Sequence, residues 1–287
     1  MSNELTIVLN SYFSSKNLYR LLKTLKKYKI IIIENSLDIN LKIDLEKKYN
    51  NVKVVIPKKN LGLAGGFNLG IKHAKTKYIF LNNPDIEITN HSIHKLILYA
   101  KKLKKFGIIA PVYHNEKKFK NYGKEISINK KNSFFKKNKV KSVNWIDNNF
   151  FIEKQKIKKN LFDENYFLYF ETIDFCLNLR RNNNDLLILP KVSFVHYHSK
   201  SIDIKYKKIA TLTRAWHYNW SKFYYFKKNY NYVYALIKIL PNLMQAIKKI
   251  IVNILKLNML NVYISLIEVY GIFSSILLLK SFYRPKI

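Results

Sequence analysis

The first hundred residues alternate between two patterns of hydrophobic and polar positions. Continuous runs of β-branched and aromatic residues are typical of strands buried on both faces of a parallel sheet, and they alternate with segments of helical spacing. The predicted strands span residues 5–9, 30–34, 52–56 and 78–81. This alternation predicts an α/β fold with a doubly wound, mainly parallel sheet.

Polar residues directly follow three of these predicted strands. They occupy positions 34–36, 57–60 and 82–85. In open parallel sheets, ligands bind at the carboxyl ends of the strands. We therefore expect the three segments to converge on one crevice.

Most of the 7 glycines of the chain lie in one stretch after the third predicted strand, at Gly62, Gly65, Gly66 and Gly70. Glycines let the main chain turn tightly and approach a diphosphate or sugar closely, and Asn60 and Asn68 could fix the turn or bind the same ligand. The alternative is that the glycines only allow a helix to pack closely on a strand. The stretch lacks the G-x-G-x-x-G spacing of dinucleotide-binding turns.

β-type patterns return at 107–111, 143–153 and 185–201, where Pro190 is expected to separate two strands. Between them, the polar, lysine-rich stretch 115–139 predicts a surface excursion.

The segment 162–181 predicts a loop that continues as a helix. Four polar residues recur on it at spacings of three and four, which places them on one face, opposite Ile173 and Leu177. They are Glu171, Asp174, Asn178 and Arg181.

The composition is strongly basic, with 52 Lys and Arg against 18 Asp and Glu and a formal net charge of +34. This charge fits three interpretations: a codon bias that enriches Lys, Asn and Ile together, attraction to an anionic membrane surface, or nucleic-acid binding. The lysines follow no single stripe, so we expect no specific nucleic acid as partner.

The single cysteine, Cys176, excludes an intramolecular disulfide, and no signal-peptide pattern opens the sequence, so we expect a cytoplasmic protein.

The last part of the chain, residues 229–287, differs from the rest. It is rich in Leu, Ile and Tyr, carries several lysines and has Glu268 as its one acid. The segment 262–280 approaches spanning length, but Glu268 makes it a poor span. The pattern favours amphipathic basic helices on a membrane surface. Packing against the rest of the chain, packing in a homodimer and a true span stay open as alternatives.

Three motifs in this order resemble the family 2 glycosyltransferases of the GT-A fold, in particular their bacterial rhamnosyltransferase-like branch. They are NLGLAGGFNLGI with YIFLNNPDIEI (60–88), FDENYFLYFETIDFCLNLR (162–180) and HYHSKS (196–201). A further block at 216–228 is similar to a C-terminal element of many members. The resemblance implies a GT-A domain at 1–228 with a nucleotide-sugar-binding half (1–105) and an acceptor and catalytic half (106–228), followed by a helical membrane-associating region at 229–287.

The resemblance implies inverting, metal-dependent transfer of a sugar, a rhamnose-like deoxyhexose or a hexose, from a dTDP- or UDP-linked donor to an acceptor hydroxyl. The cation, Mg²⁺ or Mn²⁺, would bind Asp85 after Asn83-Pro84, where many GT-A enzymes have Asp-x-Asp and this chain has Glu87 as the second acid. His196 or, alternatively, His198 would complete the metal site. An Asp that only caps the turn after Pro84 is the alternative.

For the nucleotide, the resemblance implies contacts from the first two strand exits. Glu34 matches the family's acidic residue near the base and ribose. Ser11 opens a Ser-Tyr-Phe sequence where the family often has Ser-Tyr-Asn, and Asn60, Asn68 and Asn83 lie in the two motif turns.

The catalytic base is open. Family members commonly show Glu-Asp-x-Asp on the relevant helix with the second residue as base, whereas this chain reads Glu171-Thr172-Ile173-Asp174. Threonine cannot accept the acceptor's proton. Glu171 or Asp174 takes the role, or the enzyme is impaired, or both acids lie on a solvated helix face.

The sequence thus predicts a peripheral protein on the inner face of the cytoplasmic membrane that glycosylates a lipid-linked acceptor and extends a bacterial surface glycan. The first alternative, motivated by Thr172, is a catalytically silent relative that binds sugar nucleotides or acts as a scaffold. The second, motivated by the net charge of +34, is a nucleic-acid-binding protein.

Overall fold

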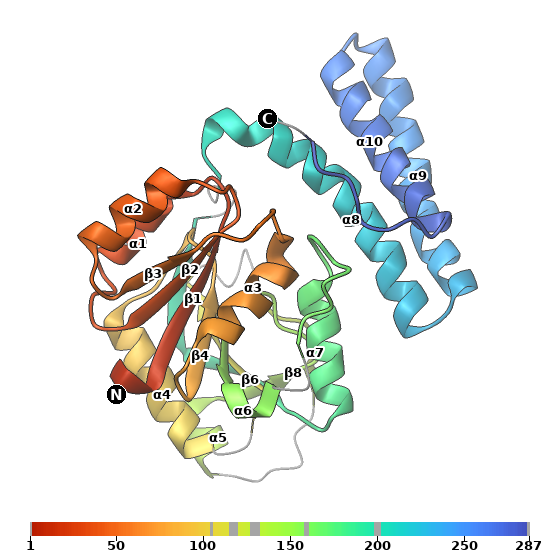
Figure 1. The fold of residues 1–287 in the computed structure, drawn as a ribbon. Coiled ribbons are helices and arrows are strands. Elements are labelled where there is room, and N and C mark those ends of the chain that lie inside the picture. The colour runs from red at the N-terminus through yellow and green to blue at the C-terminus, as the bar shows by residue number, and fades with distance from the viewer. Residues whose placement is uncertain are drawn as a thin grey trace. The chain divides into compact units, whose positions relative to one another are not determined.

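The computed structural model describes residues 2–103, 106–114, 120–126, 133–157, 161–197 and 202–285 (Figure 1). The chain divides into two compact units. The first consists of Met1–Phe162 and Thr172–Asp203, and the second of Asp163–Glu171 and Ile204–Ile287. The predicted domain boundary at residue 228 stays a prediction, because compactness alone does not define a functional domain.

The described residues of the first unit form a ten-stranded sheet. Its parallel half contains β3 (Val52–Val55), β2 (Lys29–Glu34), β1 (Leu5–Ser11) and β4 (Tyr78–Asn82), in that spatial order. The four apolar runs predicted as buried parallel strands are therefore confirmed.

The other half of the sheet is mixed. It continues with β9 (Phe150–Glu153), β6 (Ile108–Tyr113), β10 (Leu186–His196), β8 (Lys141–Val143) and β7 (Glu125–Ile126), while β5 (Ile86–Glu87) pairs with β10. β10 runs through Pro190 as one strand, whereas the sequence predicted two. Its pairing with β6 shifts register between Leu189 and Ser193, and this irregularity accommodates the proline.

Helices cover both faces of this sheet, and each face has its own apolar core (Figure 1). One core joins the sheet to α1 (Ser15–Leu22), α2 (Ile39–Lys48) and α4 (Asn90–Leu103). The other joins it to α3 (Gly62–His73) and α7 (Glu171–Arg181) and contains Cys176. Neighbouring residues of β1 alternate between the cores, with Ile7 in the first and Val8 in the second, as a doubly wound sheet requires. Two short helices, α5 (Ser133–Asn138) and α6 (Lys154–Ile157), complete this unit.

In the predicted surface excursion at 115–139, residues 115–119 and 127–132 lie outside the described residues; β7 and α5 are its described elements.

The second unit is helical. It contains the 163–171 loop and the helices α8 (Lys207–Asn229), α9 (Tyr232–Leu255) and α10 (Met259–Ile276). Trp216 and Trp220 of α8 form one apolar cluster with Ile267, and Phe223 forms another with helices α9 and α10. Asn231 and Asn258 cap α9 and α10 through their side chains. The predicted helical extension is confirmed.

The last described residues fold back onto α8. The indole Nε1 of Trp220 donates to the carbonyl of Leu279 at 2.9 Å, and His217 Nε2 lies 2.9 Å from the carbonyl of Tyr283. Burial lowers the pKa of His217 to about 3. The imidazole is therefore neutral, and it stays a structural residue of this helical core.

Candidate functional site

Buried polar side chains gather at the carboxyl ends of neighbouring strands. Ser11 pairs with Glu34 across β1 and β2, and Asn82 ends the adjacent strand β4. All three are fully buried. Within the described part of the chain, Ser11 Oγ, Glu34 Oε2 and Asn82 Oδ1 find no hydrogen-bond partner. Buried polar atoms are almost always paired in proteins, so these orphan atoms mark a place where a polar ligand belongs.

The other carboxylate oxygen of Glu34 is paired locally. Oε1 accepts from the amide of Ser36 at 2.8 Å and from the Ser36 hydroxyl. The carboxylate is thus held in one orientation at the exit of β2.

The glycine-rich turn is built around asparagine side chains. Asn60 Oδ1 accepts from the amide of Gly62 at 2.9 Å, and Gly62 has a left-handed φ of 70°, which favours glycine. Asn35 connects this turn to β2, because its Oδ1 accepts from the amide of Leu61 at 2.9 Å. Asn10 adds a hydrogen bond to the carbonyl of Gly62 at 3.1 Å. Asn10 and Asn35 therefore position the glycine-rich turn. Sequence reasoning assigned no role to Asn10, and it placed Asn35 only in the polar segment after the second predicted strand.

Inside α3 the glycines serve close packing, the alternative that the sequence left open. A Cβ on Gly66 would lie 2.4 Å from Asn10 Oδ1, and one on Gly70 would lie 2.2 Å from Val8 Cγ1. Gly65, in the same buried stretch, precedes Gly66 in α3. Contact of Gly65 and Gly66 with a nucleotide sugar stays a prediction.

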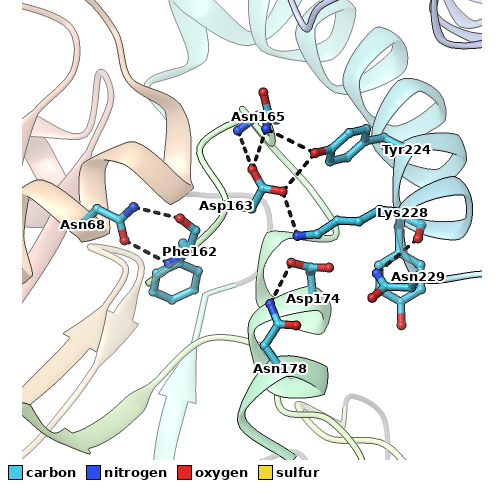
Figure 2. Close-up of polar contacts among 10 residues, drawn as sticks. Asn68, Phe162, Asp163, Asn165, Asp174, Asn178, Tyr224, Lys228 and Asn229 are labelled. Atoms are coloured by element: carbon cyan, nitrogen blue, oxygen red, sulfur yellow. Dashed lines mark hydrogen bonds and ion pairs between the residues drawn. The ribbon is translucent and has the colours of Figure 1, made fainter. Parts of the chain in front are cut away.

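Asn68 has a clear structural role. Its amide donates to the carbonyl of Phe162 at 2.9 Å and accepts from the Phe162 amide at 3.0 Å (Figure 2). These two bonds fix the main chain just before the 163–171 loop. Contact with a donor sugar stays a prediction for Asn68 too.

The structure brings Asp85 and His196 together. The turn after β4 is closed by the amide of Ile86, which donates to the carbonyl of Asn83 at 3.2 Å. β5 then pairs with the end of β10, so that His196 lies opposite Ile86. His196 Nε2 is 3.3 Å from Asp85 Oδ2, and Asp85 is buried.

Asp85 and His196 suit a divalent cation. The second oxygen, Asp85 Oδ1, is buried and has no hydrogen-bond partner among the described residues. Across the described ranges, no group of three or more His, Cys, Asp and Glu is arranged to hold a metal ion. Mg²⁺ commonly binds through one or two carboxylates together with substrate phosphates and water, and Asp85 fits that mode. His196 adds an imidazole, a common metal ligand. His198 lies outside the described residues.

Glu87 does not join this pair. Its Oε2 accepts a 2.6 Å hydrogen bond from the hydroxyl of Tyr197, whose ring lies 4.1 Å from the guanidinium carbon of Arg20. The second acid of the turn therefore holds β10 in place.

A second carboxylate, Asp147, lies in the same neighbourhood. The hydroxyl of Thr172 donates to Asp147 Oδ1 at 3.4 Å. Burial raises the pKa of Asp147, opposed by His196 and by the bond from Thr172. Burial and the charges of Asp147 and Asp85 raise the pKa of Tyr113 well above its usual value, and the Tyr113 ring packs 4.8 Å from that of His196. Sequence reasoning missed Asp147, because it lies inside the segment 143–153 that was predicted as β-type throughout, whereas the structure places it in a turn between β8 and β9.

The structure encloses the acidic face of α7 in protein. Glu171 and Asp174 are buried, with Asp174 completely inaccessible, whereas Ile173 and Leu177 are partly exposed. The helix packs through Phe175, Cys176 and Leu179, which flank Asp174 along the chain. The solvated-face interpretation of the two acids is therefore excluded. Asn178 donates to Asp174 Oδ2 at 3.4 Å (Figure 2).

In the second unit, Asp163 anchors the 163–171 loop to α8 (Figure 2). Asp163 Oδ2 accepts from Tyr224 at 3.0 Å and from Lys228 at 2.7 Å, and Oδ1 accepts from the Asn165 amide at 3.0 Å. Burial raises the pKa of Asp163, but the hydrogen bonds, foremost that from Lys228, outweigh it and leave the pKa lowered. This contact gives the 216–228 block a physical role that its sequence did not reveal.

Comparison with known proteins agrees with this architecture. The family model described as Glycosyl transferase family 2 matches residues 5–168, more than half of the chain. A search of curated proteins finds no match.

Solved structures share the fold at low sequence identity. TarS 1-349 of S. aureus in complex with UDP has 14% identity and a TM-score of 0.53, over 95% of this chain and 90% of that one. The mannosyltransferase PcManGT from Pyrobaculum calidifontis, with GDP-Man and Mn²⁺, has 10% identity and a TM-score of 0.56, over 95% and 86%. A longer S. aureus TarS structure has 15% identity and a TM-score of 0.51; the match covers 74% of this chain but only 39% of that one. With its doubly wound sheet and this match, the chain belongs to glycosyl transferase family 2 and has the GT-A fold.

Proposed function

We propose that this protein transfers a sugar from a nucleoside-diphosphate sugar to an acceptor hydroxyl with the help of Mg²⁺ or Mn²⁺. The observation that carries the proposal is the Asp85–His196 pair, 3.3 Å apart, beside strand ends with orphan buried oxygens. A nucleoside diphosphate needs both features, a cation for its phosphates and polar groups for its base and ribose. Two proteins of the same fold support it, since PcManGT was solved with GDP-Man and Mn²⁺ and TarS with UDP.

In this proposal each group has a separate task. A cation held by Asp85 and His196 would supply electrostatic stabilisation of the leaving diphosphate. Glu34, held by Ser36, and Ser11 would receive the base and ribose, and Asn83 and the Gly62 turn would face the diphosphate or sugar. A dTDP- or UDP-linked donor, a rhamnose-like or hexose sugar and inversion at the anomeric carbon follow from the resemblance to the rhamnosyltransferase-like branch.

We further propose that the helical unit rests on the inner face of the cytoplasmic membrane, where a lipid-linked glycan acceptor would be found. Seven apolar side chains of α9 recur every three or four residues and are 47–64% exposed: Val233, Ile237, Leu240, Met244, Ile247, Ile251 and Ile254. Ala235, Ile239 and Ala246 form the buried side of the same helix. An outward apolar stripe of this length is unusual for a protein surface in water.

The positive charge of this helical segment supports an anionic membrane as the surface that covers the apolar stripe of α9. The α9–α10 segment carries Lys238, Lys248, Lys249 and Lys256, and its single acid, Glu268, is paired with Lys249 at 2.9 Å. In the described part of the chain, α10 alone is long and apolar enough to cross a bilayer, and 39% of it is buried within the protein. A surface-bound helix pair accounts for both the basic side chains and the buried share of α10.

Ligand-dependent stabilisation tests the nucleotide site. UDP, GDP and dTDP sugars are added to the protein with Mn²⁺ or with EDTA, and the melting temperature is recorded for wild type and Asp85→Asn. We expect one nucleotide class to raise the melting temperature of the wild type only with Mn²⁺, because a ligand that binds the native state stabilises it by mass action. Equal, metal-independent stabilisation of both proteins would contradict the Asp85 site.

A further inference from the structure

We propose that Asp147 is the general base that takes the proton from the acceptor hydroxyl. The inference rests on the proposed sugar transfer and names a residue for its chemical step. Its starting point is the hydrogen bond from Thr172 to Asp147, which places a carboxylate directly against the first turn of α7.

The turn that carries Asp147 is held in an unusual conformation. It connects β8 to β9, and the next two residues, Asn148 and Asn149, have left-handed φ values of 53° and 58°. Two successive non-glycine residues rarely adopt this conformation, and such strain concentrates at functional sites. The amide of Asp147 donates to the carbonyl of Asn121 at 2.7 Å, and Asn121 in turn donates to the carbonyl of Pro111 at 2.9 Å. The position of the carboxylate is therefore fixed from both sides of the turn.

Asp147 is also placed beside the proposed metal site. Tyr113 contacts the ring of His196 and lies within the electrostatic influence of both Asp147 and Asp85. The carboxylate thus has His196 within its electrostatic influence and Thr172 of α7 as its hydrogen-bond donor.

Accessibility distinguishes Asp147 from the acids of α7. Asp174 is completely buried and Glu171 nearly so, whereas Asp147 is partly exposed. Thr172 orients Oδ1, and no hydrogen bond from a described residue reaches Oδ2. A general base must come within hydrogen-bond reach of the proton it removes, and Oδ2 offers that position.

The step balances without another reactant. The acceptor O–H bond breaks and its proton moves to Asp147, while the acceptor oxygen forms a bond to the anomeric carbon. The bond from that carbon to the diphosphate oxygen breaks, and the electron pair leaves with the nucleoside diphosphate. Asp147 must be ionised at the start, and it returns its proton to solvent after product release.

Variants that remove the carboxylate at position 147 and introduce one at position 172, its hydrogen-bond partner, test this assignment. Nucleoside diphosphate release from pooled UDP, GDP and dTDP sugars is measured with Mn²⁺ and a bacterial membrane lipid extract as the source of acceptor, for wild type, Asp147→Asn, Thr172→Asp and the double variant. Asp147→Asn should lower kcat by about 10²- to 10⁴-fold, the usual contribution of a general base, with UDP affinity changed less than about twofold. Thr172→Asp alone should also lose activity, because two carboxylates would then lie within hydrogen-bond distance. The double variant should have a kcat at least about tenfold higher than Asp147→Asn, because it again has a carboxylate close to the position of the acceptor hydroxyl.

Each outcome decides between the possibilities. Wild-type release that persists in Asp147→Asn overturns the base assignment but leaves sugar transfer intact. No release by the wild type from any donor overturns the proposed function itself. If Asp147→Asn does not fold, Asp147→Glu replaces it: turnover equal to wild type would contradict the assignment, and a loss of about tenfold or more with an unchanged melting temperature would support it.

Discussion

The two units of this protein break the usual distribution of polar and apolar residues in opposite ways. The sheet unit buries polar groups at its strand ends, where Ser11, Glu34 and Asp85 keep oxygens without partners. The helical unit instead exposes apolar groups along α9. Folded proteins tolerate such departures where another molecule completes the surface. This contrast is the reason why we propose a small polar ligand for the first unit and an anionic membrane surface for the second.

Removing apolar side chains from the outer stripe of α9 should have the largest effect on this contrast. The variant combines Ile237→Ser, Met244→Ser and Ile251→Ser, and the matched control combines Ile39→Ser and Ile43→Ser, two isoleucines of α2 with similar exposure. We expect the first variant to bind phosphatidylglycerol-containing vesicles at least about 30-fold more weakly, because each buried side chain contributes on the order of 1 kcal/mol or more. The control should bind like wild type.

Sedimentation with vesicles measures this binding, and light scattering of the free protein measures its oligomeric state. The membrane proposal would be contradicted if the wild type were a dimer that does not bind vesicles and the α9 variant were a monomer. That result would show that a second copy of the chain covers the stripe.

In the sheet unit, Gly70→Ala should lower the free energy of unfolding. The added methyl group would lie 2.2 Å from Val8 Cγ1 in the fully buried contact between α3 and β1. Overpacking of this kind costs about 1–3 kcal/mol of unfolding free energy. Ala74→Gly at the end of the same helix is a control for backbone effects and should create no clash. Urea unfolding measures both, and an unchanged midpoint for Gly70→Ala would show that the packing adapts freely.

Acid should destabilise the inner core of the helical unit through His217, by an amount that is close to zero at neutral pH and grows with each pH unit below 6.5. Its pKa falls from an ordinary 6.5 to about 3 in the folded state because the ring is buried. Between these values the unfolded chain binds more protons, so stability is retained above pH 6.5 and falls as the pH decreases toward 3. The loss approaches about 1.4 kcal/mol per pH unit for this one group. Comparing denaturant unfolding of wild type and His217→Gln at neutral and acidic pH isolates it; parallel pH profiles would contradict the assignment.

Local patterns in the sequence were sufficient for the strands and for part of the site. Continuous apolar runs identified the parallel strands. The resemblance of the motifs grouped Asp85 with His196, and the pairing of β5 with β10 brings these two side chains together. The strands follow from a chain-local signal, because a strand that is buried on two faces must be apolar along its whole length.

The remaining features depend on tertiary contacts that no local pattern records. Asp147 meets Thr172 only because the β8–β9 turn reaches α7, 25 positions away in the chain. Helical spacing placed the acids of α7 on one face, but spacing alone does not reveal that this face is enclosed by protein. Asn68 likewise finds its partner, Phe162, 94 positions away.

Sugar transfer at the Asp85–His196 site is the central claim, and turnover tests it most directly. Purified wild type and Asp85→Asn are incubated with nucleotide sugars, a bacterial membrane lipid extract and either Mn²⁺ or EDTA, and both released nucleoside diphosphate and glycosylated lipid are quantified. The account predicts equal amounts of the two products for wild type with Mn²⁺, and a loss of about 100-fold or more in Asp85→Asn or with EDTA. Undiminished turnover in Asp85→Asn would contradict it.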